Sequence, residues 1–445
     1  MKFLVSLLLY TTLNFSVTAF PETADPGFEI RMKKYVDSLH VVDTHEHLFT
    51  PEIVNGSNFP DLMLLFQQNG YDDLISAHMP RSLFDSLYNE PLTPSQKWKL
   101  IEPFCLNAFN TSYMKVLQYG VKMLYGVDGL NEQTAAHVSD EIKKTYSTSR
   151  FDLILKDSCK IDFVIQDGYY MEGKDEYFRY AKKFDHWINV RSNYSIDSLA
   201  IAQVDPIYSL EDYERSLREA FEAGVRNGMT VVKISLAYSR TLQFEKVPVE
   251  AARKVFRKLV NGNEDLVIPF SEAKPFQDYI LYRLLELADK YDLPVAIHTG
   301  MQAGHGNILS HSDPLLLTNL FMDFPDVKFV LFHGSYPFGG ELAVLAKTFR
   351  NVYIDMNWMY SISPSYSERY LNEWLETVPV NKLMAFGGDC MAIENVYSEL
   401  HIARSLIAKV LIGKVSEGYF TEKEAKTVAR MILHDNAIDF YKLTR

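Results

Sequence analysis

The chain has 445 residues, of which 47% are hydrophobic and 23% are charged, and its formal net charge is −12. This composition supports a large core, so intrinsic disorder is excluded as the default state. The acidic balance, together with the lack of a long basic run, argues against nucleic acid as a partner. Three cysteines, Cys105, Cys159 and Cys390, allow at most one disulfide bond and so exclude a disulfide framework.

The first predicted element is a signal peptide over residues 1–19. Lys2 precedes an apolar run, and Val17-Thr18-Ala19 has small residues at the spacing of a cleavage site. We therefore expect cleavage after Ala19 and export, to the periplasm or outside the cell. The apolar run is short for a membrane span and no later stretch reaches the required length, so residues 20–445 should form a soluble protein without stable membrane insertion.

Residues 39–43 predict a short buried strand that leads into His45-Glu46-His47. Side chains alternate along a strand, so His45 and His47 should point to one side and Glu46 to the other. Two imidazoles held in this way can bind one metal ion through ring nitrogens. Because short motifs recur by accident, the motif alone is equally consistent with two ordinary polar residues at a strand end.

Residues 50 to about 155 predict a helical insertion. Thr93-Pro94-Ser95-Gln96 combines an N-cap, a proline at the first helical position and a glutamine three residues after the cap, so a helix should start there. No linker rich in Pro, Gly or Ser separates this region from the rest of the chain. We therefore interpret it as an insertion into one barrel domain and not as a free domain.

From Lys160 onwards, short apolar strands alternate with helices, the last of which begins with a capping box formed by Thr421 and Glu424. With the first strand included, eight strand candidates can be counted. This alternation is typical of parallel β/α architecture, and eight strands favour a closed (β/α)8 barrel of the TIM type over a doubly wound sheet. The strand candidates are residues 39–43, 161–165, 187–190, 230–236, 294–297, 327–332, 352–354 and 383–386.

Four further polar side chains follow predicted strands, which is where barrel enzymes place their reacting residues. Each has an ordinary explanation when taken alone. A histidine after an apolar run is more often a hydrogen-bonded core residue, an aspartate can be the N-cap of the next helix, and a lysine is usually ion-paired or solvated. Their recurrence at the same end of the inferred strands favours a shared site. The four residues are Lys233, His298, His333 and Asp389.

This order of residues resembles the amidohydrolase superfamily of metal-dependent (β/α)8 enzymes. That family has His-x-His after the first strand, Lys after the fourth, His after the fifth and sixth, and Asp after the eighth. The last third of the chain is most similar to the amidohydrolase-related branch, which includes the domain fused to glutamine synthetase in some nodulin-like proteins. The local signals are LPVAIHTG at 293–300, FHGSYP at 332–337 and NAIDFYKL at 436–443, together with Lys233, Tyr238 and Arg240.

The resemblance implies a divalent metal cofactor, with zinc as the first choice and manganese or iron as alternatives. A lysine amine is a poor metal ligand unless carbon dioxide carbamylates it, so Lys233 would bridge two ions only as a carbamate, and one or two ions remain open. His333 would ligate a second ion or polarise the substrate oxygen. Asp389 would also move a proton from the attacking water to the leaving group. The implied ligands of the first ion are His45, His47, His298 and Asp389.

The activity expected from this resemblance is hydrolysis of a C–N, amide-like or related bond in a small polar substrate by a metal-activated water. The same geometry supports decarboxylases and uronate-type isomerases, and an exported barrel could also bind a small molecule without turnover. Tyr238, Arg240 and Gln302 are candidates to bind a substrate carboxylate, Arg240 through its planar fork, although a structural role is equally consistent. The sequence does not determine the substrate or the oligomeric state, and it is compatible with a homo-oligomer.

Overall fold

The protein is described here by a computed structural model that covers residues 26–444, except for residues 58–59, 68, 204–205 and 263–265. The predicted signal peptide lies outside the described residues. Within them, no helix combines the length and the apolar character that a membrane crossing requires.

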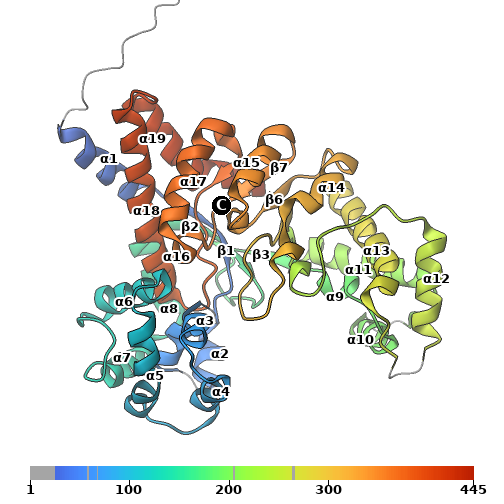
Figure 1. The fold of residues 1–445 in the computed structure, drawn as a ribbon, viewed down its shortest axis with the longest axis horizontal. Coiled ribbons are helices and arrows are strands. Elements are labelled where there is room, and N and C mark those ends of the chain that lie inside the picture. Colours follow the sequence, from blue (N-terminus) through green and yellow to red (C-terminus); the bar gives the residue numbers. More distant parts are fainter. Residues whose placement is uncertain (1–25, 58–59, 68, 204–205, 263–265, 445) are drawn as a thin grey trace, which may run out of the picture.

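The centre of the fold is one parallel sheet of eight strands, counted over the residues that the structure describes. Each strand pairs with the strand before it in the sequence, and every pairing is parallel. Figure 1 shows the connecting helices packed around this sheet. The predicted α/β fold, a (β/α)8 barrel, is therefore confirmed. The strands are β1 (Val41–Glu46), β2 (Ile161–Asp167), β3 (Phe178–Lys183), β4 (Met229–Ile234), β5 (Val295–Ile297), β6 (Phe329–Leu331), β7 (Val352–Asp355) and β8 (Leu383–Met384).

The barrel closes between its first and last strands through backbone hydrogen bonds that lie beyond the regular ladder. The amide of His47 donates to the carbonyl of Cys390 (3.0 Å), and the amide of Asp389 donates to the carbonyl of His45 (2.9 Å). Because these bonds tie the end of β1 to the segment after β8, they place the His-Glu-His motif directly beside Asp389.

The barrel interior is filled by apolar side chains from alternate strand positions, as the two-residue period of a strand requires. The C-terminal segment seals the end at which the strands begin, where Lys442 donates to the carbonyl of Asp292 just before β5 (2.7 Å). The opposite, carboxyl end of the strands is left for the polar residues. The interior cluster consists of Val42, Phe163, Ile165, Val231, Ala296, Val330, Phe332 and Met384, with Ala437, Phe440, Tyr441 and Leu443 from the C-terminal segment.

The chain between β1 and β2 forms the helical insertion that the sequence predicts, coloured blue to teal in Figure 1. The capping box at its longest helix is present: the amide of Gln96 donates to Thr93 Oγ1 (3.3 Å) and the amide of Thr93 donates to Gln96 Oε1 (2.8 Å). The insertion comprises α2 (Pro51–Gly56), η1 (Leu62–Phe66), α3 (Asn69–Ser76), α4 (Arg81–Asn89), α5 (Pro94–Ala108), α6 (Ser112–Tyr125), α7 (Ala135–Thr145), α8 (Thr148–Phe151) and η2 (Asp152–Ser158).

The strand predicted at residues 187–190 is wrong. Trp187 lies in the short helix α9 (Asp185–Ile188), and the third barrel strand is β3, which comes earlier in the chain. Most side chains of β3 are polar or basic and only partly buried, so no apolar run marks it. The other helices are α1 (Pro26–Ser38), α10 (Asn193–Gln203), α11 (Leu210–Arg226), α12 (Val249–Val260), α13 (Phe270–Lys290), α14 (Thr318–Asp323), α15 (Gly339–Thr348), α16 (Met359–Ile362), α17 (Pro364–Thr377), α18 (Ile393–Ser416), α19 (Glu422–Arg430) and α20 (Asn436–Tyr441).

Candidate metal centre

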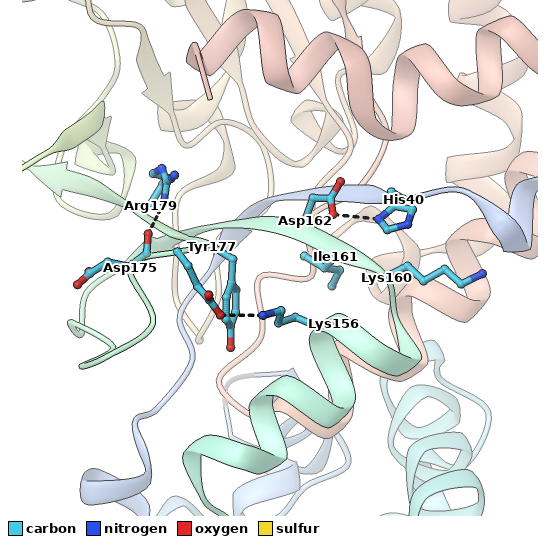
Figure 2. A pocket seen from close by; sticks show the side chains of 9 residues that line it. His40, Lys156, Lys160, Ile161, Asp162, Asp175, Tyr177 and Arg179 are labelled. Carbon is cyan, nitrogen blue, oxygen red and sulfur yellow. Dashed lines mark hydrogen bonds and ion pairs between the residues drawn. The ribbon is translucent and has the colours of Figure 1, made fainter. Parts of the chain in front are cut away.

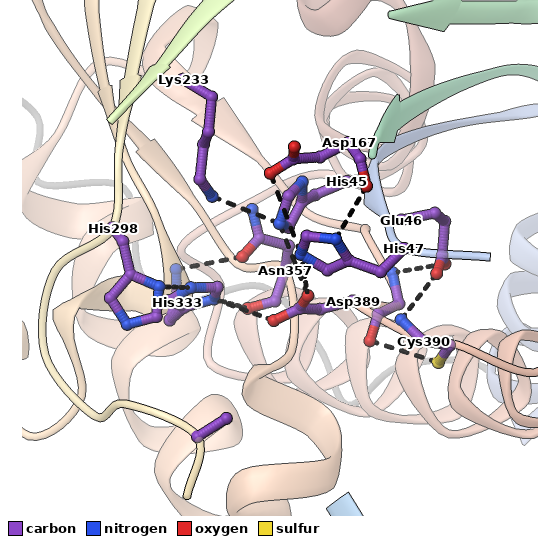
Figure 3. Close-up of polar contacts among 12 residues, drawn as sticks. His45, Glu46, His47, Asp167, Lys233, His298, His333, Asn357, Asp389 and Cys390 are labelled. Carbon is purple, nitrogen blue, oxygen red and sulfur yellow. Dashed lines mark hydrogen bonds and ion pairs between the residues drawn. The ribbon is translucent and has the colours of Figure 1, made fainter. Parts of the chain in front are cut away.

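Two histidines at the end of β1 and one aspartate after β8 converge at the carboxyl end of the barrel (Figure 3). The Oδ1 atom of Asp389 lies 3.4 Å from Nε2 of His45 and 3.3 Å from Nε2 of His47. His45 and Asp389 are buried, whereas the side chain of His47 is 22% exposed to solvent. Three candidate ligand atoms therefore face one another in a buried position that solvent reaches along His47.

Asp167, the last residue of β2, adds a second carboxylate to this group. One candidate ligand atom each from His45, His47 and Asp167 lies within 4.8 Å of the others. The Nδ1 atom of His47 donates to the backbone carbonyl of Asp167 (2.8 Å), so its Nε2 atom presents a lone pair to the centre. The carboxylate of Asp167 also forms an ion pair of 2.9 Å with Lys183.

Asp389 reaches the centre from a tight turn. Its φ angle of 53° lies in the left-handed region, which residues with a Cβ atom seldom adopt. The two glycines before it allow the turn to approach its neighbours. A Cβ atom on Gly387 would lie 2.6 Å from Cβ of Asn357, and one on Gly388 would lie 2.2 Å from Oε1 of Glu46.

His298 and His333 form a hydrogen-bonded pair beside the cluster. Nε2 of His298 donates to the carbonyl of Met301 (2.8 Å), which leaves Nδ1 to accept from Nε2 of His333 (2.8 Å). The Nδ1 atom of His333 lies 3.4 Å from the carbonyl oxygen of Asn357 and 3.9 Å from Oδ2 of Asp389. The structure thus connects His298 to Asp389 through His333, whereas the sequence analysis expected both His298 and Asp389 to contact one ion.

Lys233 extends from β4 into the same end of the barrel. Its Nζ atom lies 3.2 Å from Nε2 of His45 and 4.0 Å from the centroid of the Phe332 ring. Burial lowers the pKa of Lys233 to about 8, although the negative charge of Asp167 opposes this shift. A fraction of the amine is therefore neutral near neutral pH, and the neutral amine is the form that carbon dioxide can carbamylate.

The buried imidazoles are uncharged. Burial lowers the pKa values of His45, His298 and His333 well below their usual range, and the positive charge of Lys233 adds to this effect. Burial alone would raise the pKa of Asp167, but the neighbouring cationic side chains outweigh it and hold this pKa below its ordinary value. Neutral imidazoles and carboxylate anions are the protonation states that bind a cation.

These residues fit a divalent ion of borderline character. Imidazole nitrogens combined with carboxylate oxygens suit zinc, and also manganese and iron. The bond from His47 Nδ1 to the Asp167 carbonyl is the kind of outer contact that orients a ligating imidazole. The donor set and its tautomers therefore support a metal centre.

The three residues predicted to bind a substrate carboxylate have different surroundings. The guanidinium of Arg240 is buried and donates to Asp278 on α13 (2.6 Å), so the prediction that it binds substrate is corrected to a structural ion pair. Tyr238 is 45% exposed, and its ring centroid lies 4.8 Å from that of His298. Gln302 is buried, and its amide atoms have no hydrogen-bond partner among the described residues. Tyr238 and Gln302 therefore stay candidates.

One protein family has a model that matches part of this chain. Residues 242–443 match the model of a family described as amidohydrolase. This part of the chain belongs to the amidohydrolase family. The matched residues carry His298, His333 and Asp389, and the family recognised from the sequence is confirmed.

The chain also resembles two curated proteins over part of its length. It is 31% identical to Protein fluG of Emericella nidulans over 181 residues and 28% identical to a uronate isomerase of Nostoc punctiforme over 103 residues. These alignments cover 39% and 23% of this chain but only 21% and 22% of the two relatives. The chain therefore matches about a fifth of the length of each curated relative.

Solved structures show the same fold over nearly the whole chain. A uronate isomerase of Thermotoga maritima aligns with a TM-score of 0.75 at 14% identity, covering 93% of this chain and 97% of that one. A protein assigned as a metal-dependent hydrolase from Lactobacillus casei aligns with a TM-score of 0.64 at 17% identity, covering 92% and 97%. At these identities the likeness establishes the barrel and leaves the reaction open.

The helical insertion covers the carboxyl end of the barrel. On α6, Tyr113 stacks against Trp358, with ring centroids 6.4 Å apart, and Trp358 in turn contacts the ring of His333. On α3, Asp72 accepts from the amide of Gly304 in the loop after β5 (2.7 Å). Insertion helices and barrel loops thus enclose the centre together.

A separate pocket of about 540 Å³ lies near the opposite end of the barrel, where β1 and β2 begin (Figure 2). Two ion pairs lie in its wall: His40 contacts Asp162 (2.9 Å) and Lys156 contacts Glu176 (2.7 Å). Opposite charges therefore offset one another in its wall. We assign the chemistry to the carboxyl end of the strands, where the family's barrel enzymes carry theirs.

The sequence analysis missed two residues of this centre. Asp167 could have been found, because it directly follows a predicted strand, as the other candidates do. Asn357 also follows a predicted strand, at residues 352–354, but its contact depends on the closed barrel: its side-chain Oδ1 atom accepts from the amide of His333 (3.2 Å).

Proposed function

We propose that this amidohydrolase is a metal-dependent hydrolase that cleaves a C–N, amide-like or related bond of a small polar substrate. The observation that carries the proposal is the position of Asp389, whose Oδ1 atom lies within 3.4 Å of the Nε2 atoms of both His45 and His47. These three residues, joined by Asp167, would hold a divalent ion, with zinc as the first choice. Such an ion would lower the pKa of a water molecule toward about 7 and stabilise negative charge on a carbonyl oxygen.

Asp389 is the proposed proton carrier. Its carboxylate would accept a proton from the attacking water and return it to the leaving nitrogen. His333 lies beside this carboxylate, with its Nδ1 atom 3.9 Å from Oδ2 of Asp389 and 3.4 Å from the carbonyl oxygen of Asn357. The hydrogen bond from His333 to His298 keeps the His333 ring in this orientation.

Lys233 determines whether the centre holds one ion or two. Its Nζ atom lies 3.2 Å from Nε2 of His45, so a carbamate on Lys233 would place carboxylate oxygens among the ligands. We propose this modification for a two-ion centre. Activity should then depend on bicarbonate. If the protein binds one ion per chain and its activity does not depend on bicarbonate, Lys233 is not carbamylated.

Isomerisation of a uronate is the second candidate function. It is favoured by the 28% identity to the uronate isomerase of Nostoc punctiforme over 103 residues. The same carboxylate and imidazoles could move protons between neighbouring carbons of a sugar acid, in which case no water would attack. Decarboxylation and binding without turnover are further alternatives, and one experiment separates all four.

The test is a substrate panel run on metal-replete protein in water labelled with ¹⁸O. The panel contains N-acyl amino acids, dipeptides, lactones and uronates. The proposal predicts cleavage of an amide-type substrate with one solvent oxygen in the acid product. Conversion of a uronate to its keto isomer, with no bond hydrolysed, would replace hydrolysis by isomerisation. Release of carbon dioxide would contradict the proposal in favour of decarboxylation. Binding of a compound without any product would contradict it in favour of a binding protein without turnover.

Export is also proposed, from the predicted signal peptide. N-terminal sequencing of the mature protein should begin at Phe20. A mature protein that begins at Met1 inside the cell would contradict export and would leave the proposed chemistry unaffected.

A further inference from the structure

Glu46, the middle residue of the His-Glu-His motif, contacts the segment that carries Asp389 (Figure 3). Oε1 of Glu46 accepts from the amide of Gly388 (3.0 Å), and Oε2 accepts from the amide of Cys390 (2.6 Å). These two amides lie immediately before and after Asp389. Glu46 is fully buried, and both of its carboxyl oxygens are engaged by these amides.

The turn at Asp389 needs such a contact. Asp389 adopts a left-handed backbone conformation, which is unfavourable for a residue with a Cβ atom and persists only where the surroundings hold it. Oε2 of Glu46 is the acceptor for the amide of Cys390, whereas the amide of Gly388 also lies 3.4 Å from Oδ1 of Asp43. A buried amide that loses its acceptor costs free energy. A single carboxyl group satisfies both amides and bridges the turn. The fit is close, because a Cβ atom on Gly388 would lie 2.2 Å from Oε1 of Glu46.

We propose that Glu46 is a positioning residue that sets the turn at Asp389 and, through it, the geometry of the metal centre. One motif can do both tasks because His45 and His47 present ring nitrogens to the centre, while the two carboxyl oxygens of Glu46 accept from the amides that flank the third ligand. The inference rests on the proposed function, because it takes Asp389 as a ligand. It adds a role for a residue that is not among the proposed ligands.

The test compares three variants of the full-length protein. Glu46→Ala removes both hydrogen bonds to the turn, and Glu46→Gln keeps one acceptor oxygen and loses the other. The matched control is Glu399→Gln, because Glu399 on α18 is equally buried but accepts from the Cys390 thiol (3.6 Å) and not from the amides beside Asp389. For each variant, the dissociation constant for Zn²⁺ is measured by titration of the metal-free protein, together with the melting temperature and amide hydrogen exchange of residues 386–391.

We expect Glu46→Ala to weaken Zn²⁺ binding by about 10- to 100-fold, the usual effect of losing a contact that orients a ligand. Glu46→Gln should have a smaller effect, and Glu399→Gln should bind Zn²⁺ like the wild type even if its melting temperature falls. The amides of Gly388 and Cys390 should exchange faster in Glu46→Ala and keep their wild-type rates in Glu399→Gln.

The outcomes separate this inference from the proposed function. Wild-type Zn²⁺ affinity and wild-type exchange in a folded Glu46 variant would overturn the positioning role and leave the metal centre standing. The positioning role would also be overturned if the Glu46 variants and Glu399→Gln lost the same amount of stability and the same amount of Zn²⁺ affinity. Glu46 would then contribute to stability alone. A wild-type protein that binds no Zn²⁺ would remove the proposed function, whereas faster exchange in Glu46→Ala would still show that Glu46 holds the turn. If Glu46→Ala does not fold, Glu46→Gln decides on the same criteria.

Discussion

Asp389 is the residue on which the proposed chemistry depends most. The alternative reading, in which it caps the next helix, is excluded, since Ala392 occupies the N-cap position of α18. Asp389→Asn keeps the size of the side chain and one coordinating oxygen but removes the base. Turnover should therefore fall by about 100-fold or more while the protein stays folded. Steady-state kinetics and metal analysis of the same sample check this, and a fully active, metal-replete variant would remove Asp389 from the mechanism.

Asp355, at the end of β7, makes a second residue-scale prediction. It is buried, its Oδ2 atom has no hydrogen-bond partner among the described residues, and burial raises its pKa from 3.8 to about 7. Between these two values the folded protein keeps a proton that the unfolded chain loses. The contribution of Asp355 to the free energy of unfolding should therefore fall as pH rises through this range, by about 1.4 kcal/mol per pH unit, and level off above about pH 7.

The measurement is chemical denaturation of the wild type and of Asp355→Asn at a series of pH values. Asparagine does not titrate, so subtraction of the two stability profiles isolates Asp355 from other carboxyl groups. The wild type should be relatively more stable at the acidic end of the range. Parallel profiles, with a constant difference between pH about 4 and about 7, would show that Asp355 is ionised throughout.

At the scale of elements, the contact between α3 and the loop after β5 predicts how the centre opens. Asp72 accepts from the amide of Gly304 (2.7 Å) and lies 3.5 Å from Nε2 of His305. Asp72→Ala should make the loop after β5 open more easily. Amide hydrogen exchange of residues 301–308 should then accelerate by about 10-fold for each 1.4 kcal/mol by which the free energy of opening falls. Asp73→Ala is the control, because Asp73 accepts from Thr111 within the insertion. Equal exchange of this loop in both variants would show that Asp72 does not hold it.

The elements that could be predicted are those marked by local chemistry. The capping boxes at Thr93 and Thr421 fix helix starts through hydrogen bonds between neighbours in sequence, and both are present. β3 could not be found in this way, because its polar side chains carry no apolar run and only its pairing with β2 and β4 makes it a strand. The apolar residue Trp187 was assigned to a strand because burial alone does not distinguish a strand from a short helix.

At the scale of the whole molecule, strand order and strand direction decide which predictions hold. All strands are parallel, so residues that follow different strands meet at one end, and this is why His45, His47 and Asp389 could be grouped from the sequence. The ion pair of Arg240 could not be predicted in this way, because its partner Asp278 lies on α13. The packing of a helix against a loop does not produce a recognisable spacing of residues in the sequence. The contact of His298 with His333 likewise depends on ring orientations, which the sequence does not encode locally.

The central claim is that the carboxyl end of this barrel is a metal centre formed by His45, His47 and Asp389. The most direct measurement is the metal content, by mass spectrometry, of the full-length protein and of the His45→Ala, His47→Ala double variant, each stripped of metal and then reloaded with Zn²⁺. We predict at least one tightly held ion per wild-type chain and none in the folded double variant. An equal metal content in the two proteins, or none in the wild type, would contradict the claim.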